Sequence, residues 1–98
     1  MSRRQHFETL AIHAGYKPDA TGSLQPPVYN SVSFQFRDAE HAANLFTLKE
    51  AGYVYSRLTN PTVEALQNRL AALEGGVGAT ATASGHAAQM TALFNLMR

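Results

Sequence analysis

The sequence contains no cysteine, so it forms neither a disulfide framework nor a thiolate metal site, and a reducing compartment is permitted. It also lacks a strong charge of either sign. The formal net charge of +1 gives no electrostatic case for binding nucleic acid or an anionic membrane. The opening stretch MSRRQHFETL carries two arginines with no apolar run behind them, so it is not a signal peptide. No apolar stretch approaches the ~18 residues that span a bilayer, and we expect a cytoplasmic protein without nucleic-acid or membrane partners.

Patterns for metal binding and for nucleophilic catalysis are missing as well. The histidines are scattered, and no pair has metal-ligand spacing with a third partner, so we expect no metal site. They are His6, His13, His41 and His86. Asp38 and Glu40 are better explained as the start of a helix than as a catalytic carboxylate pair. The glycines of Gly75–Gly78 precede a predicted strand, whereas a dinucleotide fingerprint follows one.

Enough apolar residues are present for an ordered structure, since hydrophobic residues make up 45% of the 98. This length fits one small domain or part of a larger one. Apolar periodicity and turn signals predict helices, extended pieces and a long arm with little core of its own. The expected helices are 7–14, 38–52, 61–74 and 87–98, the extended pieces are 53–58 and 78–84, and the arm is 15–36. The strand at 78–84 is small and uncharged, as in a parallel α/β sheet.

The helix over 61–74 has the most complete set of local signals. Asn60 is a good N-cap, Pro61 suits the first helical position, and Gly75 and Gly76 supply a stop. Its apolar positions repeat at helical spacing. They are Val63, Leu66, Leu70 and Leu73.

Ser84-Gly85-His86 joins the predicted strand to the last helix, and two interpretations are open. A helix N-terminus offers free N–H groups and the positive end of the dipole, which attract phosphate, and glycine lets a ligand approach the backbone. The alternative is an ordinary strand-to-helix turn with a serine N-cap. The last helix runs to Arg98 with no stop signal, so we expect the chain to be part of a longer one.

Tyr55 and Arg57 are separated by a single residue, so both would point to one face of an extended segment. A phenol donor and a guanidinium fork that converge on one spot can clamp an oxyanion or a phosphate. The alternative is an exposed arginine paired with some carboxylate, beside a half-buried tyrosine.

Taken in order, the elements PPVYNSVSF, DAEHAANLF, YVYSRLTNPTVEALQNRLAALEGG and ATASGHAAQMTALF resemble the start of the Cys/Met-metabolism family of pyridoxal-phosphate enzymes. This family includes cystathionine γ-synthase, the cystathionine and methionine γ-lyases, and O-acetylhomoserine sulfhydrylase. The most specific element is YSR-x-x-NPT, followed by a helix ending in LEGG and then by A-S-G. The resemblance runs from about Thr9 to the end, and DAEHAANLF looks most like the O-acetylhomoserine sulfhydrylase branch.

The resemblance implies that pyridoxal 5'-phosphate is the cofactor and that two parts of the chain bind its phosphate. Tyr55 and Arg57 would bind the cofactor phosphate of a neighbouring subunit. The backbone amides of Gly85 and His86 would bind the phosphate of their own subunit. The family often has methionine where this chain has His86, and a backbone contact should survive that difference. A lysine that forms a Schiff base with the cofactor would come far downstream, so we expect no catalytic residue within these 98.

The implied fold is α/β, of fold type I (aspartate aminotransferase-like). Residues 1–60 would be an N-terminal arm reaching a neighbouring subunit, and residues 61–98 the incomplete beginning of the large, cofactor-binding domain. The implied activity replaces the acetate of O-acetylhomoserine with sulfide or a thiol in a homo-oligomer, a dimer of dimers, in methionine biosynthesis. The alternatives are a cystathionine γ-synthase or a γ-lyase of the same family. A stand-alone phosphate-binding or helical interaction module is the alternative of another class.

Overall fold

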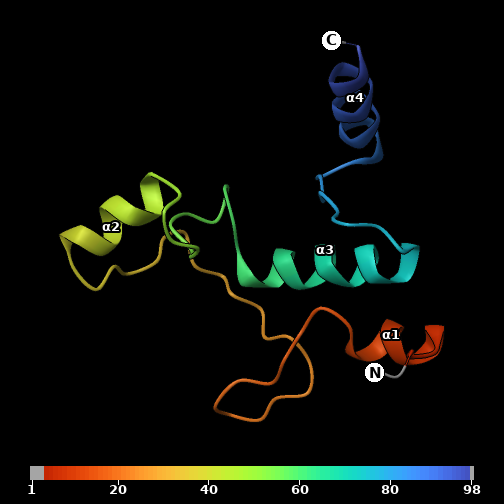
Figure 1. Ribbon diagram of the computed structural model, residues 1–98, viewed down its shortest axis with the longest axis horizontal. Helices are drawn as coiled ribbons and strands as arrows, with labels where there is room; N and C mark the ends of the chain where they lie inside the picture. Colours follow the sequence, from red (N-terminus) through yellow and green to blue (C-terminus); the bar gives the residue numbers. More distant parts are fainter. Residues whose placement is uncertain (1–3, 98) are drawn as a thin grey trace.

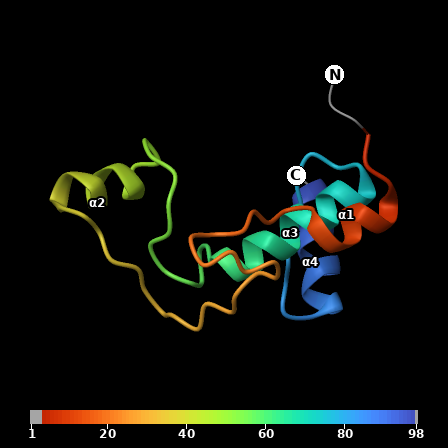
Figure 2. The ribbon, with the colours of Figure 1, turned by 90° about the horizontal axis from the view of Figure 1, so that it is seen from below.

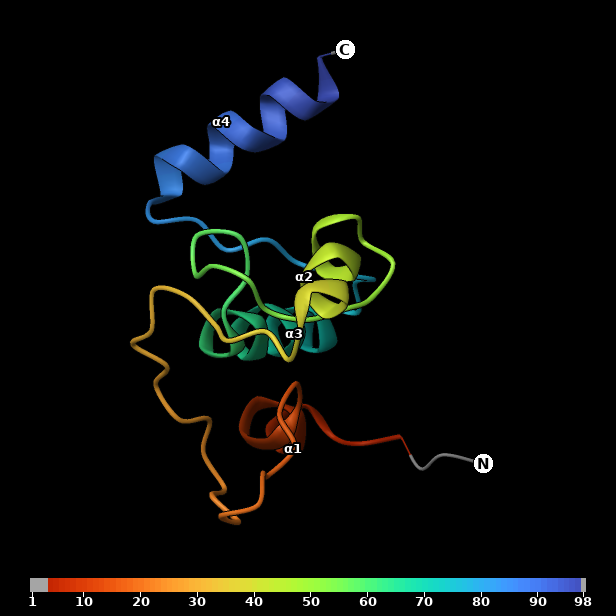
Figure 3. The same cartoon turned by 90° about the vertical axis from the view of Figure 1, so that its left-hand side faces the viewer.

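The computed structural model describes residues 4–97, which form helices joined by long irregular segments (Figure 1). The helices are α1 (Phe7–His13), α2 (Ala39–Phe46), α3 (Pro61–Glu74) and α4 (Gly85–Leu96). Helix α1 packs against α3. Helix α2 is set apart from this pair, as the view from below shows (Figure 2). Helix α4 projects away from the other three (Figure 3). No helix within residues 4–97 is long and apolar enough to cross a membrane.

Helices α3 and α4 begin with the caps that the sequence predicts. The Asn60 side chain accepts the N–H of Thr62, and Pro61 occupies the first turn of α3. The Ser84 side chain accepts the N–H of Ala87 at the start of α4. Helix α4 starts two residues earlier than predicted, and Arg98, the last residue of that prediction, lies outside the described residues.

Helix α2 has the expected N-cap, because Asp38 accepts the N–H of His41 at 2.7 Å. The prediction that it extends to Gly52 is wrong, since the helix ends at Phe46. Leu48 adopts a left-handed conformation with φ 61°, and the next N–H, of Lys49, returns to the carbonyl of Asn44 at 2.9 Å. This pattern is a Schellman stop with leucine at the position that usually holds glycine.

Gly52, at the end of the predicted range of this helix, has a packing role instead. A Cβ at this position would lie 2.7 Å from Cδ2 of Leu45. Leu45 is only 5% exposed. The absence of a side chain at Gly52 therefore lets the backbone at this position pack directly on Leu45 of α2.

The predicted strand at 78–84 is absent, because within residues 4–97 only an isolated antiparallel bridge between Ser33 and Tyr55 has β character. A strand needs partners to satisfy its backbone groups, and none lies beside this segment in the described part of the chain. The extended piece predicted at 53–58 is right as far as Tyr55, after which the chain turns.

Little apolar surface is buried in the part of the chain that the structure describes. Leu45 and Ala65 are its buried apolar residues, at 5% and 7% exposure. Helix α4 has no buried residue, although Leu93 and Phe94 would suit a core. The Cα radius of gyration is 16.0 Å, whereas a compact domain of this length has about 13 Å. The chain therefore buries less than a self-contained domain does.

Candidate functional site

Tyr55 and Arg57 lie just before α3, where Tyr55 forms the isolated bridge with Ser33 of the arm. The carbonyl of Tyr55 accepts the N–H groups of Leu58 and Thr59, at 2.9 and 3.1 Å, so the chain turns immediately after the bridge. The guanidinium carbon of Arg57 lies 5.6 Å from the centroid of the Tyr55 ring, which is a cation–π arrangement. The two side chains lie against each other, but the segment is a turn and not the extended piece for which their spacing predicts a shared face.

Arg57 has no carboxylate partner within residues 4–97. The ion pairs there join Glu50 to Arg37 at 3.0 Å and to His41 at 3.8 Å. Tyr55 is 38% exposed. The donors of the guanidinium and the phenol are therefore available to an external anion. The alternative of a structural salt bridge at Arg57 finds no support in the described residues.

A hydrogen-bond network behind this pair fixes the arm to the start of α3. The side-chain N–H₂ of Asn60 donates to the carbonyl of Tyr29 at 3.0 Å and to Oγ of Ser56 at 2.9 Å. The hydroxyl of Thr62 donates to the carbonyl of Pro27 at 3.0 Å and accepts the N–H of Tyr29 at 2.9 Å. Asn60 and Thr62 therefore connect segments more than thirty positions apart in the sequence.

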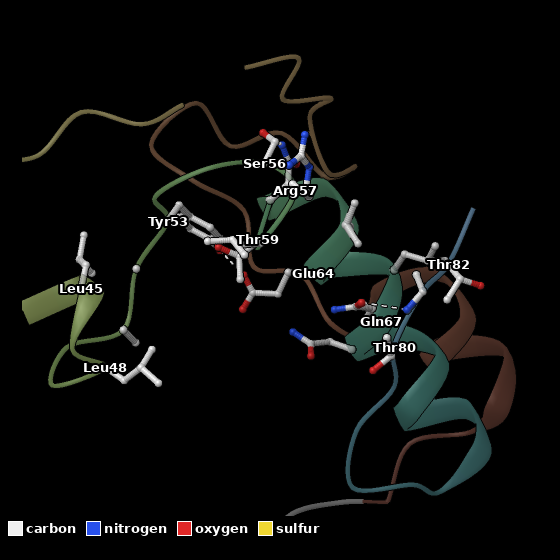
Figure 4. A pocket seen from close by; sticks show the side chains of 18 of the residues that line it. Leu45, Leu48, Tyr53, Ser56, Arg57, Thr59, Glu64, Gln67, Thr80 and Thr82 are labelled. Atoms are coloured by element: carbon white, nitrogen blue, oxygen red, sulfur yellow. Dashed lines mark hydrogen bonds between the residues drawn. The ribbon is translucent and has the colours of Figure 1, made fainter. Parts of the chain in front are cut away.

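An open groove of about 1090 Å³ runs along α3 from the end of α2 to the segment before α4 (Figure 4). Leu45 and Leu48 lie at one end, and Gln67, Thr80 and Thr82 lie at the other. Ser56 and Arg57 lie on one side between these ends. Helix α3 fixes the segment before α4 along this groove, because Oε1 of Gln67 accepts the N–H of Ala81 at 2.9 Å. This backbone contact occupies a donor that the predicted strand would have used for pairing.

Tyr53 and Glu64 form a polar pair in the middle of the groove. The Tyr53 hydroxyl donates a hydrogen bond to the Glu64 carboxylate. Burial raises the pKa of Tyr53 to about 12, and the hydrogen bond and negative charge of Glu64 act in the same direction. This phenol therefore remains protonated at neutral pH and serves as a donor.

The start of α4 presents backbone donors that the helix does not use. The hydroxyl of Ser84 accepts the N–H of Ala87 at 3.1 Å, and its carbonyl accepts that of Ala88 at 3.1 Å. The N–H groups of Gly85 and His86 have no acceptor within residues 4–97. A Cβ added at Gly85 would meet nothing within 4 Å, so there is open space beside this residue. The serine cap and the free amides are both present, so the turn can bind an anion while capped.

The structure brings some of the four predicted site residues together and leaves others apart. Arg57 lines the groove with residues 80–83, which lead into α4. Tyr55, Gly85 and His86 do not line it, and the His86 side chain is exposed. Tyr55 with Arg57, and Gly85 with His86, are therefore two separate sets of donors within one chain.

Both sets fit an anionic group such as a phosphate ester. A phosphate dianion accepts charge-assisted bonds from a guanidinium, a phenol and free amides, and each such bond contributes about 1.5–3 kcal/mol in favourable cases. Among residues 4–97 there is no group of three or more His, Asp or Glu that could hold a metal ion.

Sequence reasoning missed the second role of Asn60, which is buried at 7% exposure. It assigned Asn60 only as the cap of α3. The cap uses the side-chain oxygen, whereas the contacts to Tyr29 and Ser56 use the nitrogen. No local pattern signals those contacts, because their partners depend on where the arm lies.

A family model described as "Cys/Met metabolism PLP-dependent enzyme" matches residues 8–98. The chain is similar to O-acetyl-L-homoserine sulfhydrylase 1 of Thermus thermophilus, with 62% identity over 91 residues, covering 92% of this chain and 22% of that protein. It is 57% identical to O-acetyl-L-homoserine sulfhydrylase of Corynebacterium glutamicum, covering 92% and 21%, and 50% identical to homocysteine synthase of Schizosaccharomyces pombe, covering 96% and 22%. The chain thus spans about a fifth of the length of these relatives.

Solved structures resemble the chain in the same way. A putative O-acetylhomoserine (thiol)-lyase from Campylobacter jejuni, which carries N'-pyridoxyl-lysine-5'-monophosphate at position 205, matches with a TM-score of 0.89 and 42% identity. The match covers 94% of this chain and 23% of that one. The metB protein of Corynebacterium glutamicum matches with a TM-score of 0.78 and 39% identity, covering 96% and 23%.

Proposed function

The chain belongs to the family of Cys/Met metabolism PLP-dependent enzymes, and from this premise we propose that it is the N-terminal part of an O-acetylhomoserine sulfhydrylase. The whole enzyme would replace the acetate of O-acetylhomoserine with sulfide or a thiol, releasing acetate and forming homocysteine or methionine. The observation that carries this proposal is the identity of 50–62% to O-acetylhomoserine sulfhydrylases and a homocysteine synthase across nearly the whole chain.

The proposed fold is that of a fold-type I enzyme, with an N-terminal arm over residues 1–60 and the start of the large domain over residues 61–98. Two observations support this division. The segment 15–36 has no buried residue and is attached to the start of α3 through Pro27 and Tyr29, and α4 exposes apolar residues that a larger domain would cover.

The proposed role of this part of the enzyme is to hold the cofactor phosphate. When bound, pyridoxal 5'-phosphate supplies an electron sink for carbanion chemistry on the substrate. Tyr55 and Arg57 would donate to the phosphate of the neighbouring subunit, and the amides of Gly85 and His86 to that of their own. The Arg57 guanidinium, which has no carboxylate partner, and the unused amides in the described part of the chain support a role in binding phosphate.

Assembly follows from this division. A site that takes donors from two subunits requires at least a dimer, and we propose a dimer of dimers in the cytoplasm. Cofactor binding would then stabilise the assembly, because a ligand that contacts both subunits favours the associated state. The lysine that holds the cofactor would come from beyond this chain, as position 205 of the Campylobacter jejuni protein suggests.

The test is an assay of the full-length enzyme loaded with pyridoxal 5'-phosphate and given O-acetylhomoserine. We expect homocysteine formation that depends on added sulfide. Release of 2-ketobutyrate without sulfide would indicate a γ-lyase instead, and cystathionine formation with cysteine in preference to sulfide would indicate a cystathionine γ-synthase.

A further inference from the structure

Ser56 stands between the two clamp residues and is hydrogen-bonded to the arm. Its N–H donates to the carbonyl of Val32 at 2.9 Å, and its hydroxyl donates to the carbonyl of Ser31. Tyr55 and Arg57, on either side, converge on each other with the guanidinium carbon 5.6 Å from the ring centroid. The side chain of Ser56 is thus attached to the arm, whereas the side chains of Tyr55 and Arg57 make no hydrogen bond within residues 4–97.

Asn60 holds Ser56 from the other side of the turn. Its side-chain nitrogen donates to Oγ of Ser56 at 2.9 Å and to the carbonyl of Tyr29 at 3.0 Å. Its side-chain oxygen accepts the N–H of Thr62 at 2.9 Å. Asn60 is 7% exposed and is the buried polar residue of the described chain. Both polar atoms of this side chain are therefore hydrogen-bonded, and they connect the turn at 56–59 to the arm and to α3.

We propose that Ser56 and Asn60 form a positioning pair that sets the direction of the Tyr55–Arg57 clamp toward the cofactor phosphate. The pair touches neither cofactor nor substrate. An arginine and a tyrosine on a free turn would lose much rotamer and backbone freedom on binding, whereas a turn already fixed by hydrogen bonds has less to lose. This inference rests on the proposed function, because it assigns a supporting role to the same phosphate site.

The competing interpretation is that the network only attaches the arm to α3 and caps the helix. Thr62 separates the two interpretations. Its hydroxyl also attaches the arm, through Pro27 and Tyr29, but it makes no hydrogen bond with Ser56. A purely structural network predicts equal effects at Thr62 and Ser56, and a positioning pair predicts a larger effect at Ser56.

The experiment measures binding of pyridoxal 5'-phosphate and of pyridoxal, which lacks the phosphate, to the full-length apoenzyme by absorbance or fluorescence titration. The variants are Ser56→Ala, Asn60→Ser, Thr62→Val and Arg57→Ala, with Ser56→Thr as the conservative control. Serine at position 60 keeps a good helix cap but is too short to reach Ser56 and Tyr29. Ser56→Ala leaves the N–H contact to Val32 in place, so a folded protein is retained if Asn60→Ser fails to fold.

We expect Ser56→Ala and Asn60→Ser to weaken binding of pyridoxal 5'-phosphate about tenfold, corresponding to roughly 1.4 kcal/mol, with pyridoxal binding unchanged. Ser56→Thr and Thr62→Val should remain close to the wild type. Adding Ser56→Ala to Arg57→Ala should weaken binding little further, because the clamp it positions is already lost.

Three results would overturn the proposal. They are wild-type affinity in Ser56→Ala, equal loss for pyridoxal and its phosphate, or an equal loss in Thr62→Val. If the wild-type apoenzyme itself fails to bind pyridoxal 5'-phosphate, the proposed function falls first and the positioning pair with it. Binding by the wild type with no effect of Ser56→Ala rejects the pair alone.

Discussion

At the scale of single residues, a close approach between backbones occurs at Gly15. It has φ +82°, and a Cβ there would lie 2.7 Å from the backbone nitrogen of Arg69 and 2.8 Å from the carbonyl oxygen of Ala65. The Nε of Arg69 donates to the carbonyl of Ala14 at 2.8 Å next to this contact. The end of α1 thus rests directly on the backbone of α3, and only glycine satisfies both the conformation and the space.

We therefore predict that Gly15→Ala lowers the free energy of unfolding of the full-length enzyme by more than the ~1–2 kcal/mol of left-handed strain alone. Overpacking against a rigid backbone adds about 1–3 kcal/mol. Gly22→Ala is the matched control, because Gly22 has φ +75° and a Cβ added there would meet nothing within 4 Å, so this variant reports strain only. Denaturant unfolding of both variants measures the difference. Equal losses would contradict the packing role of Gly15.

The Tyr53–Glu64 pair predicts a pH dependence at the same scale. The folded protein holds the pKa of Tyr53 at about 12, whereas an unfolded tyrosine titrates near a pKa of about 10. Between these values the unfolded state has lost the proton and the folded state retains it. This contribution to stability is therefore complete below about pH 10 and is lost as the pH rises toward about 12.

Spectrophotometric titration of the phenols tests this prediction in wild type and in Tyr53→Phe. The variant should lose the latest-titrating phenol, and its stability should fall less steeply with pH in this window. A variant whose highest-pH titration step is unchanged would show that Tyr53 is not the protected group.

Among the helices, α2 is followed by a leucine in a conformation that usually belongs to glycine. Leu48 takes the left-handed position of the Schellman stop and is 90% exposed, so its side chain gains nothing from this chain in return. Leucine at φ 61° is strained by about 1–2 kcal/mol relative to a right-handed conformation, and glycine is not.

Leu48→Gly should therefore stabilise the α2 region by about 1 kcal/mol. Leu48→Ala is the control, because it removes the side chain but keeps the strain. Hydrogen exchange of the α2 amides in the full-length enzyme compares the two variants. If glycine and alanine give the same protection, the backbone conformation of Leu48 is not what limits the stability of this helix.

The elements also show what the sequence can predict. The caps Asn60 and Ser84 and the stop at Gly75 act through neighbours within a few positions, so α3 and α4 were predicted close to their observed limits. The end of α2 was not, because leucine carries no signal for a left-handed conformation. The prediction of a strand at 78–84 was wrong for a different reason, since a strand needs pairing partners that are distant in the sequence. The contacts of Asn60 with the arm could not be predicted for the same reason.

At the scale of the whole molecule, the radius of gyration of 16.0 Å and the exposed α4 describe a chain whose apolar surface is mostly uncovered. Burial of apolar surface is the main driving force of folding, and the two buried apolar residues among residues 4–97 supply very little of it. The relatives that this chain matches are about five times as long.

We predict that a polypeptide of residues 1–98 alone does not unfold cooperatively and tends to aggregate, since its apolar helices lack partners. Circular dichroism during denaturant titration, together with size-exclusion chromatography, measures this. A monodisperse monomer with a sharp unfolding transition would instead favour the stand-alone module.

We propose above that Tyr55 and Arg57 of one subunit bind the cofactor phosphate of another. The most direct test of this proposal is complementation between two inactive full-length variants, Arg57→Ala and a variant whose cofactor-binding lysine is replaced. Co-refolded hetero-oligomers contain some sites that combine an intact lysine from one subunit with an intact Arg57 from the other. We predict that sulfide-dependent homocysteine formation returns in the mixture and is absent from each variant alone. Hetero-oligomers that form but show no restored activity would contradict it.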